Sequence, residues 1–136
     1  MTLRKWLILS LIFCCVSCTP QGGQQSETRL VQKGAAQISY QPAQLQTESP
    51  LSLAVRTPSG WQLHKATLVG LTMEMPRMPL FFTQNNDPAQ PEANWQTQFL
   101  IGACADAQMT WRLELLFIDE KGAEQRLSDE FVVYRR

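Results

Sequence analysis

Apolar and polar residues alternate along most of the chain from Arg29 onward. The clearest case is the stretch "MTWRLELLF", in which Thr110, Arg112 and Glu114 separate apolar neighbours. Its apolar face consists of Met109, Trp111, Leu113, Leu115 and Phe117. A period of two is typical of a β-strand that turns one face to the core and the other to solvent. The same alternation in "QISYQ", "LSLAV", "NWQTQFLI" and "EFVVY" predicts further strands of this kind.

Turn-forming residues separate these stretches. "TPSG" at residues 57–60 has proline in the second place and glycine in the fourth, which suits a type I turn. "DEKG" at residues 119–122 lies between two strong strand patterns and predicts a hairpin whose Gly122 is left-handed. "TQNNDPAQPEAN" at residues 83–94 predicts a polar loop.

These elements together predict an all-β fold. About seven short strands in about 110 residues, with no helical period beyond the N-terminal segment, are typical of an immunoglobulin-like antiparallel β-sandwich. We expect one such domain over residues 29–136, because a chain of this length forms a single small core.

A cluster of methionines extends one of the strand patterns. In "QLHKATLVGLTMEM", Leu63, Val69, Leu71, Met73 and Met75 share one phase, so the strand is expected to continue to Met75 with both sulfurs facing the core. Pro76 then interrupts the ladder, which leaves Met78 in a loop. His64 falls on the polar face and is expected to be exposed.

The N-terminus has the pattern of an export signal. Arg4 and Lys5 precede an almost wholly apolar stretch at residues 6–18, which is short for a membrane-spanning helix. "CVSC" at its end resembles the bacterial lipobox, and it predicts lipidation of Cys18 after removal of residues 1–17 as a signal peptide. A plain hydrophobic anchor and a conventional cleaved signal are the alternatives.

The segment after Cys18 predicts a flexible tether at residues 18–28, because it is rich in Gly, Gln and Ser. Thr19 stands where lipoproteins of enteric-type bacteria carry an aspartate for inner-membrane retention. By comparison with those lipoproteins, we expect a lipid-anchored protein of the bacterial cell envelope that faces the periplasm. The outer membrane is favoured over the inner, because Thr19 is not an aspartate.

The charge balance argues against nucleic acid as a partner. The full chain has 12 Lys and Arg and 12 Asp and Glu, and removal of the signal peptide takes away Arg4 and Lys5 but no acid. A slightly acidic chain lacks the basic patch that nucleic-acid binding requires. No enzyme is expected either, because no catalytic motif surrounds Cys104 or His64.

The sulfur-bearing residues suggest soft-metal chemistry. Thioether and thiolate ligands favour Cu(I), whereas a single histidine supplies Zn(II) or Cu(II) sites poorly. The candidate ligands are Met73, Met75, Met78, Cys104 and Met109. Methionine is also a common filler of core gaps, and cysteine is often a small buried hydrophobe. A methionine-rich surface that binds a protein partner is a third possibility.

Four stretches follow one another between residues 49 and 117: "LSLAVRTPSG", "ATLVGLTMEMPRMP", "WQTQFLIG" and "MTWRLELLF". In this order they resemble the YtkA-like and FixH-like periplasmic modules. It implies an immunoglobulin-like sandwich concerned with copper handling or with assembly of respiratory oxidases. This chain differs in the longer turn "GACADAQMTW", which adds Cys104.

The sequence therefore predicts a lipoprotein that binds Cu(I) through methionine and cysteine sulfur. It would pass the metal to a copper-accepting envelope protein or a respiratory oxidase. The alternative is a structural or protein-binding envelope lipoprotein without metal, whose methionines only pack the core. A copper site needs the sulfurs to meet at an accessible rim, whereas packing places them inside the sandwich.

Overall fold

The computed structural model describes residues 27–85, 89 and 92–136. The predicted signal peptide, Cys18 and most of the tether lie outside these residues. The strands are β1 (Arg29–Lys33), β2 (Ala36–Gln41), β3 (Leu45–Gln46), β4 (Leu51–Pro58), β5 (Gln62–Gly70), β6 (Met78–Pro79), β7 (Thr83–Asn85), β8 (Glu92–Phe99), β9 (Gln108–Ile118) and β10 (Glu124–Tyr134). The described part of the chain contains no helix, and so no helix that could span a membrane.

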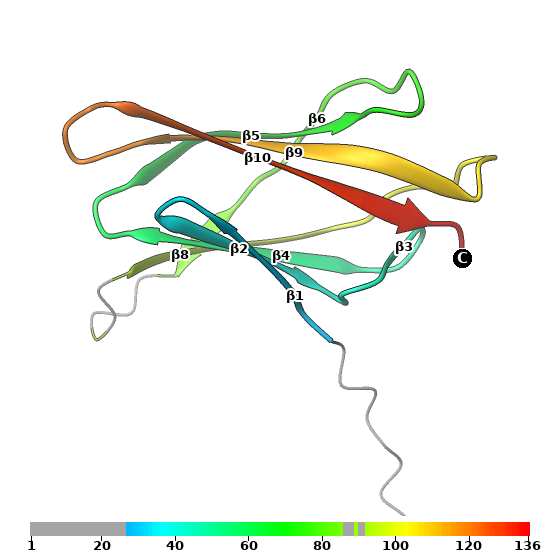
Figure 1. Ribbon diagram of the computed structural model, residues 1–136, viewed down its shortest axis with the longest axis horizontal. Helices are drawn as coiled ribbons and strands as arrows, with labels where there is room; N and C mark the ends of the chain where they lie inside the picture. Colours follow the sequence, from blue (N-terminus) through cyan, green and yellow to red (C-terminus); the bar gives the residue numbers. More distant parts are fainter. Residues whose placement is uncertain (1–26, 86–88, 90–91) are drawn as a thin grey trace, which may run out of the picture.

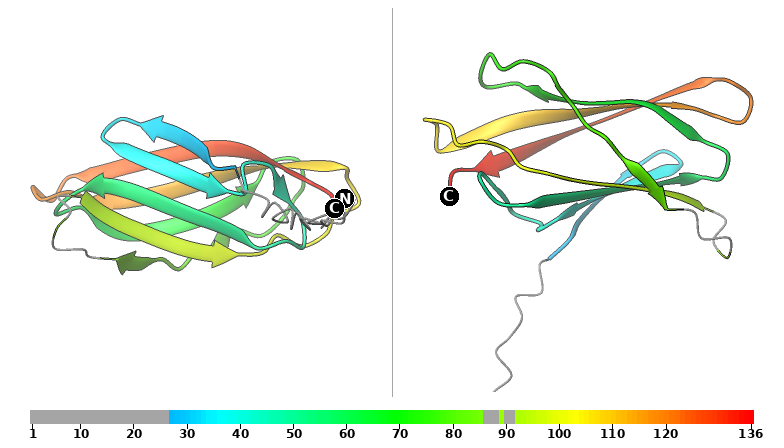
Figure 2. Two further views of the ribbon diagram at one scale, coloured as in Figure 1. Left: turned by 90° about the horizontal axis from the view of Figure 1, so that it is seen from below. Right: turned by 180° about the vertical axis from the view of Figure 1, so that it is seen from behind.

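Two five-stranded sheets face each other as the layers of a sandwich (Figure 1). One has the order β1-β2-β4-β8-β7 and the other β3-β10-β9-β5-β6. Every pairing is antiparallel except that of β3 with β10. The segment between β6 and β7 crosses from one sheet to the other (Figure 2). The predicted all-β sandwich is confirmed.

The arrangement of the strands is that of immunoglobulin-like domains. In such domains the second, fifth and fourth strands of the fold share one sheet, and the third, sixth and seventh share the other. Here β4, β8 and β7 form the first set and β5, β9 and β10 the second. The predicted number of about seven strands agrees with the described strands that have five or more residues, while β3, β6 and β7 are shorter.

The core lies between the sheets and follows the predicted alternation of β9. All five apolar positions of that strand, from Met109 to Phe117, are buried. At one end of the sandwich Phe117 contacts Trp61 and Trp95, with ring centroids 5.9 and 6.1 Å away. Aromatic rings at such distances and tilts pack favourably. This end of the core is closed by rings.

Strand β5 departs from the predicted phase because it contains a β-bulge. Leu63 pairs with Phe117, but Lys65 pairs with Leu116, so His64 is an extra residue in the ladder. A bulge of one residue reverses which side chains face inward beyond it. Ala66 and Leu68 are consequently buried. The prediction that Leu63, Val69 and Leu71 share the core-facing phase was wrong, whereas the predicted exposure of His64 is confirmed.

The predicted hairpin between β9 and β10 is confirmed. Gly122 has φ +78°, in the left-handed region, and its amide donates to Asp119 O at 2.9 Å. The Asp119 carboxylate also accepts hydrogen bonds from the amides of Lys121 and Ala123. Hydrogen bonding to Ala123 and Gln125 lowers the pKa of this carboxyl, since the bonds favour its charged form.

The predicted loop at residues 83–94 was too long. Thr83 to Asn85 form β7 and pair with β8, which itself begins at Glu92. The sequence pattern did not reveal β7 or the beginning of β8, because these segments carry many polar Gln, Asn and Thr side chains, which are also typical of loops.

A buried carboxylate joins the two sheets at the edge formed by β1. Asp129 on β10 points inward and is 6% exposed. It accepts a 2.9 Å hydrogen bond from the Tyr40 hydroxyl of β2, and Arg29 and Lys33 of β1 lie 3.3 and 3.4 Å from its oxygens. Arg29 also covers the Tyr40 ring at 5.0 Å. Burial, then the Asp129 charge, raises the pKa of Tyr40 far above its ordinary value, so the hydroxyl remains a donor.

We expect Asp129→Asn to lower the free energy of unfolding by about 2 kcal/mol, because two cations at the sheet edge lose their counter-charge. Urea denaturation measures the change. The matched control is Glu130→Gln on the same strand, which breaks the exposed pair with Arg112 and should cost below about 0.5 kcal/mol. Equal losses in the two variants would show that the buried carboxylate does not join the sheets.

Candidate functional site

Met73 and Met75 lie in the loop of residues 71–77 that joins β5 to β6, since β5 ends at Gly70. The prediction that the strand continues to Met75 was wrong. The loop is fixed to the beginning of β9: the Leu71 amide donates to Thr110 O at 2.8 Å, and the Thr110 amide donates to Thr72 Oγ1 at 3.2 Å. The chain thus leaves the ladder after the Gly70 position but remains attached to the sheet.

Met75 folds back over Gly70. Gly70 pairs with Trp111, whose side chain faces the core, so the missing side chain of Gly70 leaves a gap on the inner face. A Cβ at Gly70 would lie 3.4 Å from Met75 Cβ and 3.3 Å from Met73 O. A 2.9 Å hydrogen bond from the Met75 amide to Met73 O holds the bend. Met75 therefore occupies the place that a larger residue at position 70 would take.

Met78 is part of a strand, contrary to the prediction that it lies in a loop. It begins β6 and pairs with Leu68 of β5, whose side chain is fully buried. Met78 is half-buried at the edge of that sheet. Its neighbour Arg77 reaches Glu114 of β9 with a 2.8 Å ion pair, which anchors the start of β6.

Met109 and Cys104 approach the same end of the sandwich from the β8–β9 connection. Met109 is 2% exposed and belongs to the core. Cys104 is half-buried in the loop of residues 100–107. Arg135 holds this loop, because its amide donates to Ala107 O and its guanidinium to Ala105 O, both at 2.9 Å. The loop that carries Cys104 is therefore tied to the end of β10.

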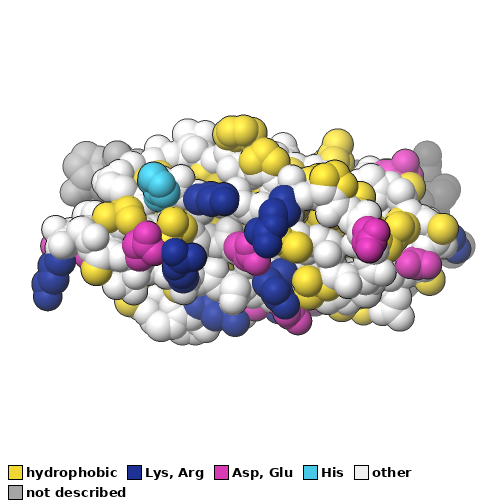
Figure 3. Space-filling view, turned by 90° about the horizontal axis from the view of Figure 1, so that it is seen from above, with side chains coloured by type: hydrophobic (Ala, Val, Ile, Leu, Met, Phe, Trp, Pro, Cys, Tyr) yellow, Lys and Arg dark blue, Asp and Glu magenta, His cyan; other side chains and the backbone are white. Residues whose placement is uncertain are grey.

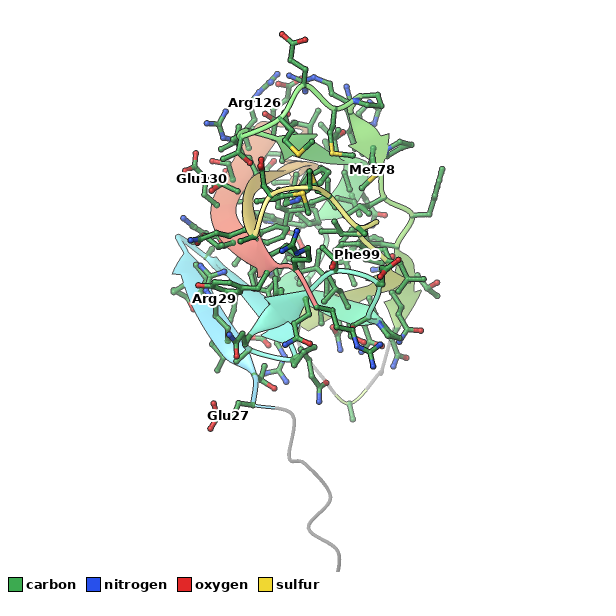
Figure 4. All side chains as sticks on the ribbon, turned by 90° about the vertical axis from the view of Figure 1, so that its right-hand side faces the viewer. Glu27, Arg29, Met78, Phe99, Arg126 and Glu130 are labelled. Carbon is green, nitrogen blue, oxygen red and sulfur yellow. The ribbon has the colours of Figure 1, made fainter. Side chains whose placement is uncertain are left out.

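The sulfur-bearing residues gather at one end of the sandwich. The β5–β6 loop and the β8–β9 loop both lie there (Figures 1 and 2), and sulfur atoms surround this end close to the labelled Met78 (Figure 4). Four of the five side chains are half-buried and pack against the core: Met73, Met75, Met78 and Cys104. Met109 belongs to the buried core against which they pack. We call the four half-buried residues the sulfur rim.

Trp111 is the residue beneath the rim that sequence reasoning missed as part of the site. It is fully buried, and its Nε1 has no hydrogen-bond partner among the residues described. A thioether sulfur is only a weak acceptor, but it packs well against an aromatic ring. Gly70, which makes room beside Trp111, was the available signal in the sequence. Its importance becomes visible only once the register of β5 on β9 is known.

His64 lies far from the sulfur rim. It sits at the bulge beside Phe117, whereas the rim adjoins Met109, eight positions along β9. Eight residues of strand span about 26 Å. His64 and Cys104 therefore do not form a nucleophile–base pair in this structure. Within residues 27–85, 89 and 92–136 no three His, Cys, Asp or Glu side chains are grouped as metal ligands. The donors at the rim are thus thioethers and one thiol.

No protein-family model matches the chain, and no curated protein is similar to it. The structure is similar to the crystal structure of a DUF4426 family protein from Pseudomonas aeruginosa PAO1, with a TM-score of 0.51. The two chains are 13% identical, and the alignment covers 79% of this chain and 94% of the other. A likeness at this identity supports the fold alone.

The burial of the sulfurs predicts different costs of truncation. Met109→Ala should lower the free energy of unfolding by about 3 kcal/mol, because it leaves a cavity in the core, whereas Met75→Ala should cost about 1 kcal/mol, because the loop can close over the gap. Urea denaturation compares them, with Met109→Leu as the volume-conserving control. If Met75→Ala cost as much as Met109→Ala, the rim would be part of the core.

Proposed function

We propose that the protein is a lipid-anchored periplasmic protein that binds Cu(I) at the sulfur rim. The observation that supports this best is that four half-buried sulfur side chains, from two loops and from β6, lie at the same end of the sandwich and pack against the core. Half-burial keeps the sulfurs accessible to an ion, while the hydrogen bonds of Leu71 and Arg135 hold both loops in place. Soft sulfur donors without clustered carboxylates or imidazoles favour Cu(I) over harder ions.

Within this proposal, Met73, Met75, Met78 and Cys104 are the ligands, and Met109 supports them from the core. A thioether has no proton to lose before it binds a metal, so the methionine donors stay available in an acidic periplasm. The Cys104 thiol gives up its proton when it binds the metal. Transfer would proceed by exchange of one sulfur at a time for a donor of the acceptor protein.

The acceptor is proposed from the resemblance to YtkA-like and FixH-like modules. It would be a copper-accepting envelope protein or a respiratory oxidase. Lipidation at Cys18 and the tether of residues 18–28 would place the rim within reach of a membrane-bound acceptor, because a flexible segment of this composition lets the domain reorient.

A second candidate function is protein binding without metal. Each rim side chain packs against the core, which is also what a purely structural methionine does. Phe81, on the crossover between β6 and β7, is 83% exposed, and Leu100, at the start of the loop that carries Cys104, is 59% exposed. Exposed apolar side chains of this size commonly take part in protein interfaces.

A Cu(I) competition titration separates the two functions. The segment from Gln24 onward is used, which leaves out Cys14, Cys15 and Cys18 and keeps every described residue. We expect it to take one Cu(I) from a weak chromogenic chelator, and Met75→Leu with Met78→Leu to weaken binding about tenfold or more.

Leucine preserves volume, so urea denaturation of the double variant should show a loss below about 1.5 kcal/mol. Met109→Leu is the matched control and should bind Cu(I) as the unmodified segment does. Equal uptake by all three proteins, or no uptake by any, would contradict the copper proposal and leave the protein-binding function.

The lipid anchor has its own test. We expect Cys18→Ala, expressed with its full N-terminus in a Gram-negative host, to keep the mass of the unprocessed chain and to lack acyl groups. Mass spectrometry of the membrane fraction measures both. Cys15→Ala should be processed and acylated normally, and acylation of the Cys18→Ala protein would place the modified cysteine elsewhere.

A further inference from the structure

The outer face of the sheet that contains β5, β9 and β10 has a charged depression of about 440 Å³. Basic side chains gather near the middle of this face, with acidic side chains among them (Figure 3). Lys65, Arg77 and Arg126 line the depression together with Glu114. A hollow of about 470 Å³ on the other sheet is lined without any charged side chain. The two hollows on the outer faces of the sheets therefore differ in charge.

The register of the strands places two cations on opposite sides of one apolar residue. Leu116 of β9 pairs with Lys65 on one neighbouring strand and with Arg126 on the other. Strands in a sheet are spaced 4.7–4.9 Å apart, so these two Cα atoms are about 10 Å apart and both side chains have room to meet over Leu116. The adjacent row consists of Thr67, Glu114 and Ser128.

The β-bulge is what brings Lys65 to this face. Without the extra residue at His64, Lys65 would share the inward phase of Leu63 and enter the core. Bulges commonly redirect a side chain at a functional position. The bulge interrupts the ladder and exposes Lys65 opposite a second cation. A sheet face that is merely solvated does not require this arrangement.

The charges of the depression are only partly satisfied within the protein. Arg77 pairs with Glu114 and Arg126 with Glu124, and both pairs are largely exposed. Lys65 has no ion pair with any described residue. Exposed ion pairs contribute little, so a ligand with more negative charge can draw Arg126 away from Glu124. Glu114 opposes anions but is neutralised by Arg77.

We propose that this depression binds a phosphate group, held between Lys65 and Arg126 over Leu116, with the Ser128 hydroxyl as a further donor. The oxygens of a phosphate are arranged tetrahedrally and not in one plane as in a carboxylate, so free phosphate, or a phosphodiester headgroup through its two unesterified oxygens, can engage two cations and a hydroxyl together. The group can belong to free phosphate or to the headgroup of an anionic phospholipid. The proposal is independent of copper binding.

The test is an NMR titration of the ¹⁵N-labelled full chain in neutral detergent micelles. One arm adds inorganic phosphate, and the other replaces part of the detergent with phosphatidylglycerol. We expect amide shifts at Lys65, Thr67 and Ser128. Lys65→Gln and Arg126→Gln should each weaken binding about threefold and together about tenfold. Glu114→Gln should strengthen it about twofold, because it removes the opposing carboxylate.

Arg56→Gln on β4 is the matched control, since Arg56 is an exposed cation of the other sheet and should have no effect. Shifts with both probes assign the site to the phosphate group itself, and shifts with phosphatidylglycerol alone assign it to the lipid headgroup. For either assignment, binding must be weaker in the Lys65→Gln and Arg126→Gln variants. No shifts with either probe, or equal binding by these variants and Arg56→Gln, overturns the proposal.

Discussion

The extra residue at His64 in β5 is the constraint on which both proposed binding surfaces depend. Before it, Leu63 faces the core; after it, the inward positions are Ala66, Leu68 and Gly70. The same change of phase sends Lys65 outward to stand opposite Arg126, and it brings a glycine rather than a valine to the inner face beside Trp111. One irregularity in a ladder therefore exposes a cation on one side of the sheet and opens a gap on the other.

The two ends of the core are closed by different chemistry. Rigid rings, Trp61 and Trp95 against Phe117, fill the end near the β9–β10 hairpin. At the other end Met75 fills the gap over Gly70. Thioether side chains adapt to irregular space and remain polarisable, so the cap they make can yield to an entering ion at little cost. A ring in the same position would hold its place, and this difference is why the sulfur end is the better candidate for binding.

The sequence predicted the elements that obey a simple period and failed where the period breaks. The alternation from Met109 to Phe117 and the left-handed Gly122 were correct, because each depends on local rules. The phase of β5 was wrong, because nothing local marks His64 as a bulge. The boundaries of the strands were also wrong. Met73 and Met75 were expected in a strand but are in a loop, and Met78 was expected in a loop but is in a strand. The placement of the loop that carries Cys104 depends on contacts such as Arg135 with Ala105, which join residues 30 positions apart and leave no periodic signal.

The contact between Tyr40 and Asp129 also has a consequence for how the domain assembles. These residues are 89 positions apart, and β3 joins β10 over a similar separation. Contacts so distant along the chain require most of the polypeptide to be ordered before they contribute, which makes folding slow. The β9–β10 hairpin can form early from local contacts, whereas the edge made by β1, β2 and β3 must close late. A chain of this topology therefore stays open longer after synthesis than one built from local contacts, which would suit the export proposed above.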